Sequence, residues 1–403
     1  KVYFKFRVRK FMKLFKSLLV APATLGLLAP VAATANEVTI SDFTPAEQLA
    51  ITNSRVDGLE ARLNNIEAGS FSETTTASFS VDFAIGAVDG RGVTTTITDG
   101  DEDLQATYGF QIDLSTSFTG EDSLDISLDA GNSNGALAEF DTNGEAVTNA
   151  ATDPDTTASD ILTVDGVSYT FPLGGATAFV GDNTDGSMLF TTACAYGGPS
   201  NTLDDCANVT AGITGGGLSI GAAYDFDNGF STAFGAQFSE TGIATDETDD
   251  SYALNAAYTA DSYGVSITYA NVEDGNDNDT YTAFNGYYSF DNGLSISAGY
   301  EIGDLDGVAA TVDETEAYFV GINGEVGPGE LGAAAGTVGV QTEAAGSIPD
   351  RMMYEIYYSY AVNDGMTITP LIYTKEAGEI VSGSVVAGDQ DETGIMVKTS
   401  FSF

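Results

Sequence analysis

The second half of the chain consists of alternating segments joined in pairs by five short turns. Each segment has about ten residues in which apolar and polar side chains alternate, the period of a β-strand. The turns contain the Asn-Gly, Asp-Gly and Pro-Gly pairs that suit tight connections. Their final glycines, 35, 29, 36 and 36 residues apart, are Gly229, Gly264, Gly293, Gly329 and Gly365. The pattern predicts consecutive antiparallel hairpins and no helical repeat.

The same alternation predicts further strands before residue 131. Three are clear, over 74–88, 106–119 and 123–129, and two apolar pieces at 161–171 and 176–180 favour two more. Eleven strands follow from 217 onward. The predicted fold is therefore an all-β, transmembrane antiparallel β-barrel of about 16 strands over 71–403, with 14 strands as the alternative, since single-chain bacterial barrels have even counts. A barrel this wide leaves a water-filled channel.

The last ten residues alternate in the same way, with Phe401 and Phe403 on the apolar face. This ending resembles the C-terminal signature of bacterial outer-membrane proteins. No stretch after residue 35 has 18 consecutive apolar residues, whereas a closed sheet satisfies its own backbone polar groups in lipid. Aromatic residues at strand ends are expected to form interfacial girdles, although β-propensity alone is an alternative explanation. They are Phe226, Phe230, Phe290, Tyr300, Tyr354, Tyr360 and Tyr373.

The N-terminal 35 residues have the pattern of a secretory signal peptide. Seven basic residues precede an apolar stretch at 18–28, and Ala33-Thr34-Ala35 follows as a cleavage pattern. A transmembrane helix is the disfavoured alternative, because the apolar stretch is short and contains prolines. We expect translation to start at Met12. The mature chain would carry 6 basic and 59 acidic residues, or 6 − 59 = −53 charges, which argues against a nucleic-acid partner.

Residues 36–70 are predicted to form a short periplasmic helix. Leu49, Val56 and Leu63 are spaced by seven residues. Leu59 lies three residues after Val56, and Ile66 lies three residues after Leu63. This spacing is typical of a coiled coil and favours a homotrimer. A single amphipathic helix at the barrel mouth is the alternative, because three heptads are marginal alone.

The alternation also predicts which side chains enter the lumen. Placing the large apolar residues in lipid turns Asp82, Asp113, Asp125, Asp129 and Lys398 inward. Rings of acidic side chains favour cations, so we expect a cation-preferring pore.

Two long irregular segments, at about 131–160 and 182–210, interrupt the hairpins. The second contains Cys194 and Cys206, the two cysteines of the chain, for which an exported protein predicts a disulfide. We hypothesise that this segment folds into the pore. An outward cap is the alternative.

The sequence contains few residue patterns that are typical of a catalytic or metal site. The chain has no histidine, which excludes His-based triads and His metal sites. The acidic run 274–279 departs from a calcium loop, because Asp279 stands where the glycine of the sharp turn is needed. We therefore expect no enzyme activity, no cofactor and no metal.

Several short stretches resemble the cyanobacterial porins of the OprB-type, carbohydrate-selective family. They include residues 55–63, 71–75, 116–124, 169–172 and 179–181. The resemblance implies a trimeric outer-membrane porin of a Gram-negative-type bacterium, a cyanobacterium, that passes sugars or inorganic ions, including iron. It does not extend to peptidoglycan anchoring, because about fifteen residues stand where those porins carry an S-layer-homology domain. Asp125 and Asp129 also replace the arginines usual in that family's second hairpin.

Three functions follow as hypotheses. The first is passive diffusion of small hydrophilic solutes and ions through the barrel, with outer-membrane lipid around it. The second is a structural or binding barrel whose lumen is occluded by its long segments. The third is a secreted soluble β-protein adapted to a saline medium.

Overall fold

The fold is given by a computed structural model, which divides the chain into a first unit, residues 1–69, and a second unit, residues 70–403. The signal peptide expected at 1–35 and the coiled coil expected at 36–70 lie outside the described residues. The structure describes residues 75–90, 104–132, 137, 139–140, 147–148, 157–158, 161–240, 242–243, 245, 250–274, 277–306, 314–342, 351–376, 379–380, 386–387 and 391–403.

The second unit is one large antiparallel sheet. Its strands in the first half are β1 (Thr75–Asp89), β2 (Gln105–Thr116), β3 (Ser123–Gly131), β6 (Thr163–Leu173), β7 (Ala176–Asp182), β8 (Leu218–Asp225) and β9 (Phe230–Phe238). They continue with β10 (Ser251–Thr259), β11 (Tyr263–Asp274), β12 (Asp277–Ser289), β13 (Leu294–Asp304), β14 (Glu314–Val326), β15 (Gly329–Thr337), β16 (Gln341–Thr342), β17 (Met352–Asn363), β18 (Met366–Lys375) and β21 (Glu392–Ser402). Two separate pairs are β4 (Val147–Thr148) with β5 (Thr157–Ala158), and β19 (Glu379–Ile380) with β20 (Val386–Ala387).

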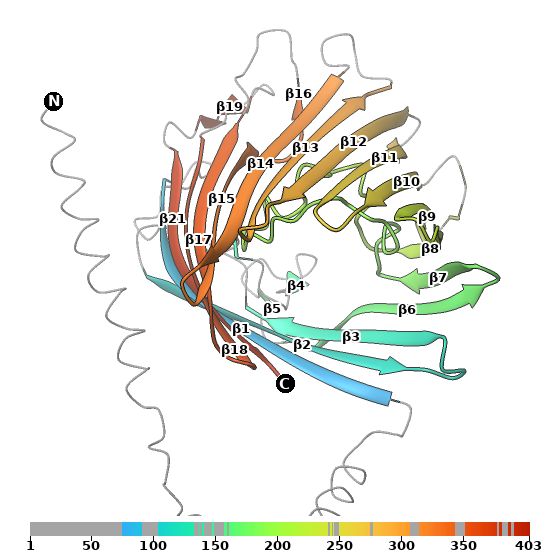
Figure 1. The fold of residues 1–403 in the computed structure, drawn as a ribbon, viewed down its shortest axis with the longest axis horizontal. Helices are drawn as coiled ribbons and strands as arrows, with labels where there is room; N and C mark the ends of the chain where they lie inside the picture. The colour runs from blue at the N-terminus through green and yellow to red at the C-terminus, as the bar shows by residue number, and fades with distance from the viewer. Residues whose placement is uncertain are drawn as a thin grey trace, which may run out of the picture. The chain divides into compact units, whose positions relative to one another are not determined.

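The large sheet closes on itself (Figure 1). Each strand pairs with its neighbours in chain order, and β21 pairs with both β18 and β1. The short β16 continues β15, because both pair with β14. Counted this way the ring has sixteen strands, which confirms the predicted barrel and shows that the alternative of fourteen is wrong. The pieces at 161–171 and 176–180 form β6 and β7.

The barrel has an apolar outer face and a largely polar inner face. On β1, Phe79, Phe83 and Ile85 face outward and are exposed, whereas Asp82 between them is buried. The register carries this alternation from strand to strand. The inversion relative to a water-soluble fold is what a barrel surrounded by lipid needs. Among the described residues, no helix is long and apolar enough to span a membrane.

The connections differ at the two rims. One rim has tight turns, such as those around Gly229, Gly293 and Gly327, all with positive φ. Tyr and Phe rings gather on its outer face, for example Tyr224 with Phe226 and Tyr288 with Phe290. The other rim carries the longer connections. Most of the predicted girdle residues face outward near a rim, but the prediction for Tyr373 is wrong. Its side chain points into the barrel, is buried and donates a hydrogen bond to Glu392.

Candidate functional site

The segment 183–217, between β7 and β8, runs inside the barrel (Figure 1). Its first part lies across β10 to β13, where three of its backbone N–H groups donate to inward side chains. Thr191 donates to Oδ1 of Asn255 on β10 at 3.0 Å. Ala193 and Ala195 donate to the hydroxyls of Ser266 on β11 and Ser297 on β13, both at 2.9 Å. We call residues 183–217 the infolded loop.

The tip and the return of the infolded loop are also held by wall side chains. The Tyr196 hydroxyl donates to Oε1 of Glu355 on β17 at 2.6 Å. On the way back, the amides of Thr210 and Ala211 donate to the Glu301 carboxylate on β13, at 3.0 and 2.8 Å. Glu301 is 0% exposed and Glu355 5%. Two buried carboxyl groups thus hold the loop against the wall.

Glycines on the inner face leave the space in which the infolded loop lies. We call Gly235, Gly299, Gly321 and Gly336 the seat glycines. A Cβ at Gly299 would meet the carbonyl oxygen of Cys206, and one at Gly235 would meet the carbonyl oxygen of Gly186. A Cβ at Gly321 would lie 2.7 Å from Cδ2 of Tyr196, and one at Gly336 2.9 Å from Cδ2 of Leu203. Real Cβ atoms do not approach other atoms so closely, so the loop can contact the wall because these side chains are missing.

A second segment reaches the same side of the interior. Phe140 forms a backbone bridge with Ser200 of the infolded loop, and Glu139 forms an ion pair with Lys375 on β18. Leu137 and Phe140 are buried in one apolar cluster with Tyr196 and Leu203 of the loop and Phe319 of the wall. Described parts of both predicted long segments, 131–160 and 182–210, therefore lie within the barrel.

The structure joins Cys194 and Cys206 by a disulfide, with their Cα atoms 6.5 Å apart. It links the outgoing and returning parts of the infolded loop. The sulfurs lie beside the apolar cluster, in which Cys206 is buried. Of the two positions considered for this segment, inside the pore or as an outward cap, the structure has the first.

The predicted pore-lining residues all point inward but differ in exposure. Asp82 and Asp129 are only 4% and 5% exposed, so their carboxylates contribute little to the open surface. Asp113 and Asp125 are half-buried. Lys398 points at Phe140, with its Nζ 5.9 Å from the ring centroid, and is partly covered by the second segment.

The wall formed by β1–β3 keeps a hydrogen-bonded polar surface. The Asp113 carboxylate accepts from Gln111 at 2.9 Å and from Ser127 at 2.8 Å. On the neighbouring strand, Ser123 donates to Asp125 at 2.9 Å. These donors are neutral, so the hydrogen bonds bring no positive charge beside the two carboxylates. This array, Asp113 and Asp125 with their serines and Gln111, is called the acid–serine wall below.

Acidic side chains outnumber basic ones on the inner face of the described strands. The inward positions of the described strands carry many carboxylates and two amines, those of Lys375 and Lys398. In the infolded loop, burial raises the pKa of Asp205 to about 6; the Ala207 amide opposes this effect and the Glu301 charge adds to it. Burial and the nearby Glu355 raise the pKa of Tyr196. Among the described residues, no group of three or more His, Cys, Asp or Glu side chains is arranged to hold a metal ion.

The sequence reading missed the residues that hold the infolded loop. Glu301, Glu355 and the seat glycines come from strands that were predicted correctly, but their roles were not. One signal was available, because inward positions of the middle strands are unusually small: Gly221, Gly235, Gly299, Gly321, Gly332 and Gly336. Small inward residues on neighbouring strands, here β8 with β9 and β13 to β15, leave space for another segment of chain.

The fold is that of a porin-type β-barrel. No protein-family model matches the chain, and no curated protein matches it. Among solved structures, a mutant of the porin of Rh. blastica is similar over 82% of this chain and 100% of its own, with 16% identity and a TM-score of 0.52. The anion-selective porin from Comamonas acidovorans is similar over 82% of this chain and 99% of its own, with 14% identity and a TM-score of 0.56.

Proposed function

We propose that this protein is an outer-membrane porin, through which small hydrophilic solutes and inorganic ions diffuse passively, with a preference for cations. The observation that carries the proposal is a closed barrel of sixteen strands, apolar outside and polar inside, whose interior is narrowed by a loop fixed to one side. An apolar outer band needs lipid around it. A barrel of this width has room for water even with one loop inside.

The cation preference is supported by the charges that remain beside the open part of the lumen. Asp113 and Asp125 lie on the acid–serine wall, whereas Lys375 is paired with Glu139 and Lys398 is covered by Phe140. Carboxylates along a pore attract cations and repel anions. The anion selectivity named for the Comamonas protein is not carried over, because a similarity of 14% identity concerns the fold alone.

Purified protein in a planar lipid bilayer provides the test. We expect stable, voltage-independent steps of conductance and, under a salt gradient, a reversal potential of the sign for cation permeation. Steps with the opposite reversal potential would reject the cation preference. The absence of any conductance, with the protein shown to be inserted, would reject the porin function.

The choice of solute rests on the family resemblance and needs its own measurement. Liposome swelling with a series of neutral sugars tests carbohydrate passage, and conductance in solutions of inorganic cations, including iron salts, tests ions. Swelling that depends on sugar size alone would indicate a general pore. The proposed trimer, which the heptads at 49–66 suggest, is tested by chemical cross-linking before and after deletion of residues 36–70.

An occluded barrel is the second candidate function, and one observation favours it. The infolded loop, Leu137 and Phe140 pack into one apolar cluster with β1, β14, β15, β17, β18 and β21, so part of the interior is filled as in a soluble core. A structural or ligand-binding role would then replace diffusion. The bilayer measurement separates the two candidates directly.

A further inference from the structure

Two carboxylates stand opposite each other on the inner face, at the rim that carries the tight turns, called the tight-turn rim below. Glu325 near the end of β14 and Glu330 near the start of β15 are directly paired in the register of these strands. Directly paired residues of antiparallel strands point to the same face with Cβ atoms about 5 Å apart, and like charges in this arrangement repel each other. A positive charge between the two side chains would remove this repulsion.

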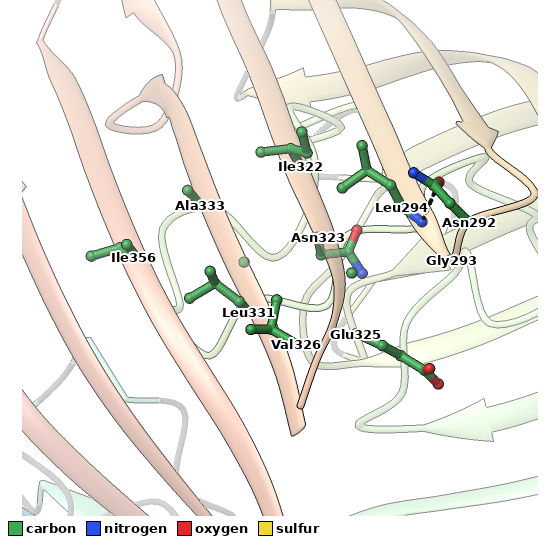
Figure 2. Close-up of a pocket in the computed structure, with 12 residues that line it drawn as sticks. Asn292, Gly293, Leu294, Ile322, Asn323, Glu325, Val326, Leu331, Ala333 and Ile356 are labelled. Carbon is green, nitrogen blue, oxygen red and sulfur yellow. Dashed lines mark hydrogen bonds between the residues drawn. The ribbon is translucent and has the colours of Figure 1, made fainter. Parts of the chain in front are cut away.

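The neighbours of this pair show that both side chains point into the lumen. Tyr357, which is buried on the inner face of β17, donates its hydroxyl to Oε1 of Glu330 at 2.7 Å. Figure 2 shows the Glu325 side chain extending away from Val326 and Leu331, which are exposed on the outer face of the same two strands. Glu325 is exposed and Glu330 is half-buried. Ions in the lumen can therefore reach the pair.

The Asn323 side chain lies beside the same pair and has one unused oxygen. Its Nδ2 donates to Oε2 of Glu330 at 3.3 Å, which places the carboxamide at the carboxylate. The residue is only 8% exposed, and its Oδ1 has no hydrogen-bond partner in the described part of the chain. A buried amide oxygen without a partner is costly, and reversing the amide would bring Oδ1 against the Glu330 carboxylate. A cation beside the pair would give Oδ1 the partner that it lacks.

The basic side chains of the described residues lie away from the tight-turn rim. Arg351 precedes β17 and Lys375 ends β18, both at the opposite rim. Lys398 points at Phe140 from the middle of β21. Since none of these three compensates the charges of Glu325 and Glu330, the compensating charge is left to a cation from the solution.

We propose that Glu325, Glu330 and Oδ1 of Asn323 bind a calcium ion at the tight-turn rim of the pore. The inference deepens the proposed function and rests on it for the passage of cations past this site. All three ligands are hard oxygens. Calcium accepts about six to eight oxygens in irregular geometry, including water, whereas magnesium requires a near-octahedral site. The described residues form no closed metal centre of three acidic, His or Cys side chains, so binding by two carboxylates is exchangeable, with a dissociation constant of about 10⁻⁴–10⁻³ M.

Calcium binding to the folded barrel in detergent provides the test, with calcium chloride titrated in a calorimeter at constant ionic strength. Glu325→Gln removes one ligand charge from an exposed side chain and leaves the strand pairing intact. Asn323→Asp replaces the neutral ligand by a third carboxylate of the same shape. The matched control is Glu121→Gln, which removes an exposed carboxylate from the turn between β2 and β3 at the same rim. Heat-modifiable migration on a gel shows that each variant is folded.

We expect one calcium ion to bind per wild-type barrel. The dissociation constant should rise about tenfold in Glu325→Gln, fall in Asn323→Asp and stay unchanged in Glu121→Gln, because ligand charge sets calcium affinity. An unchanged constant in Glu325→Gln would overturn the site. An equal rise in Glu121→Gln would do the same, since it would assign the binding to the charge of the whole rim. If Asn323→Asp does not bind more tightly, Oδ1 is not a ligand, and equal binding of magnesium would overturn the choice of calcium.

Conductance separates this inference from the proposed function. Calcium added on the side of the tight-turn rim should lower the single-channel potassium current of the wild type more than that of Glu325→Gln, because a bound ion occupies the path. An equal decrease in both would overturn the position of the site on the path. A barrel that binds calcium without conducting would refute the porin function and leave the site in place, whereas a conducting barrel that binds no calcium would do the reverse.

Discussion

Two halves of one barrel wall differ in what their inner faces carry. The strands β1–β3 present aspartates and serines, and their surface around Asp113 and Asp125 is only half-buried. The strands β9–β17 present glycine, alanine and a few buried carboxylates, and the infolded loop lies against them. The outer faces of both halves have the same apolar alternation. The comparison teaches that the outer face follows from the surroundings of the barrel, whereas the inner face is divided between passage and support of the loop.

The largest expected effect comes from filling the seat of the loop. Gly299→Val places two methyl groups where the Cys206 carbonyl now lies, which should displace the returning part of the loop and cost about 1–3 kcal/mol. We expect a higher single-channel conductance. Gly286→Val is the matched control, because Gly286 faces outward on the adjacent β12 and its added Cβ would make ordinary contacts. Equal conductance in both variants would contradict the role of the seat.

The next effect concerns the carboxylate that holds the returning loop. Glu301→Ala leaves the Thr210 and Ala211 amides without their acceptor, which costs about 1–3 kcal/mol, mainly for the fully buried Ala211 because Thr210 is only half-buried. Amide exchange of residues 207–213 should become faster, and the open-channel current noisier. Glu301→Gln keeps one acceptor oxygen, so its amide exchange rate and its current noise should lie between those of the wild type and those of Glu301→Ala. Glu316→Ala, which removes an outward-facing carboxylate on β14, serves as the control and should change neither readout.

A smaller effect is expected from pH. The pKa of Asp205 rises from an ordinary 3.8 to about 6 in the docked loop, so the docked state binds a proton more tightly than an undocked one. Docking is therefore strongest in acid and weakens as the pH rises through about 6, by at most ~3 kcal/mol. Exchange of the loop amides, corrected for intrinsic rates, should be slower at pH 5 than at pH 7. Asp205→Asn should remove this difference; its persistence would assign the titration to another group.

The smallest expected effect is on ion selectivity, and it tests the open half. Asp113→Asn with Asp125→Asn should lower the cation-to-anion permeability ratio about two- to fivefold, equivalent to no more than about 1 kcal/mol. The pair Asp82→Asn and Asp129→Asn removes the same charge from buried positions and should change the ratio less. Reversal potentials under a salt gradient measure both. A larger change in the buried pair would show that the passage runs elsewhere.

The strands could be predicted from the sequence because each carries its own evidence. Phe79, Phe83 and Ile85 alternate with Asp82 within one strand, and the alternation fixes both the element and the side that faces out. The same parity turned Asp82, Asp113, Asp125, Asp129 and Lys398 inward, as the structure has them. The position of Tyr373 near a strand end predicts an outward girdle residue. Tyr373 is two residues from the inward Leu371, however, so the alternation of β18 turns it inward as well.

The interior could not be predicted to the same extent, because it depends on contacts between residues far apart in sequence. Tyr196 meets Glu355, 159 positions away, and nothing local to either residue indicates the pairing. The same holds for Phe140 and Ser200, whose bridge joins two irregular segments. The exposed fractions of the inward aspartates also depend on contacts with residues far away in the sequence. Asp82 and Asp113 are equivalent by alternation, and packing inside the barrel makes one buried and the other half-open.

The closure of the sheet has a consequence for how the barrel forms. Phe79 and Phe403 exchange both backbone hydrogen bonds at 3.0 Å, although they are 403 − 79 = 324 positions apart. Every other pair of neighbouring strands is joined by a shorter stretch of chain, so this seam carries the longest loop-closure entropy in the molecule. Until it forms, β1 and β21 each expose a row of unpaired amides and carbonyls, which a membrane interior does not tolerate. We therefore expect assembly to proceed through an open sheet sheltered from lipid, with insertion and seam formation as one cooperative step.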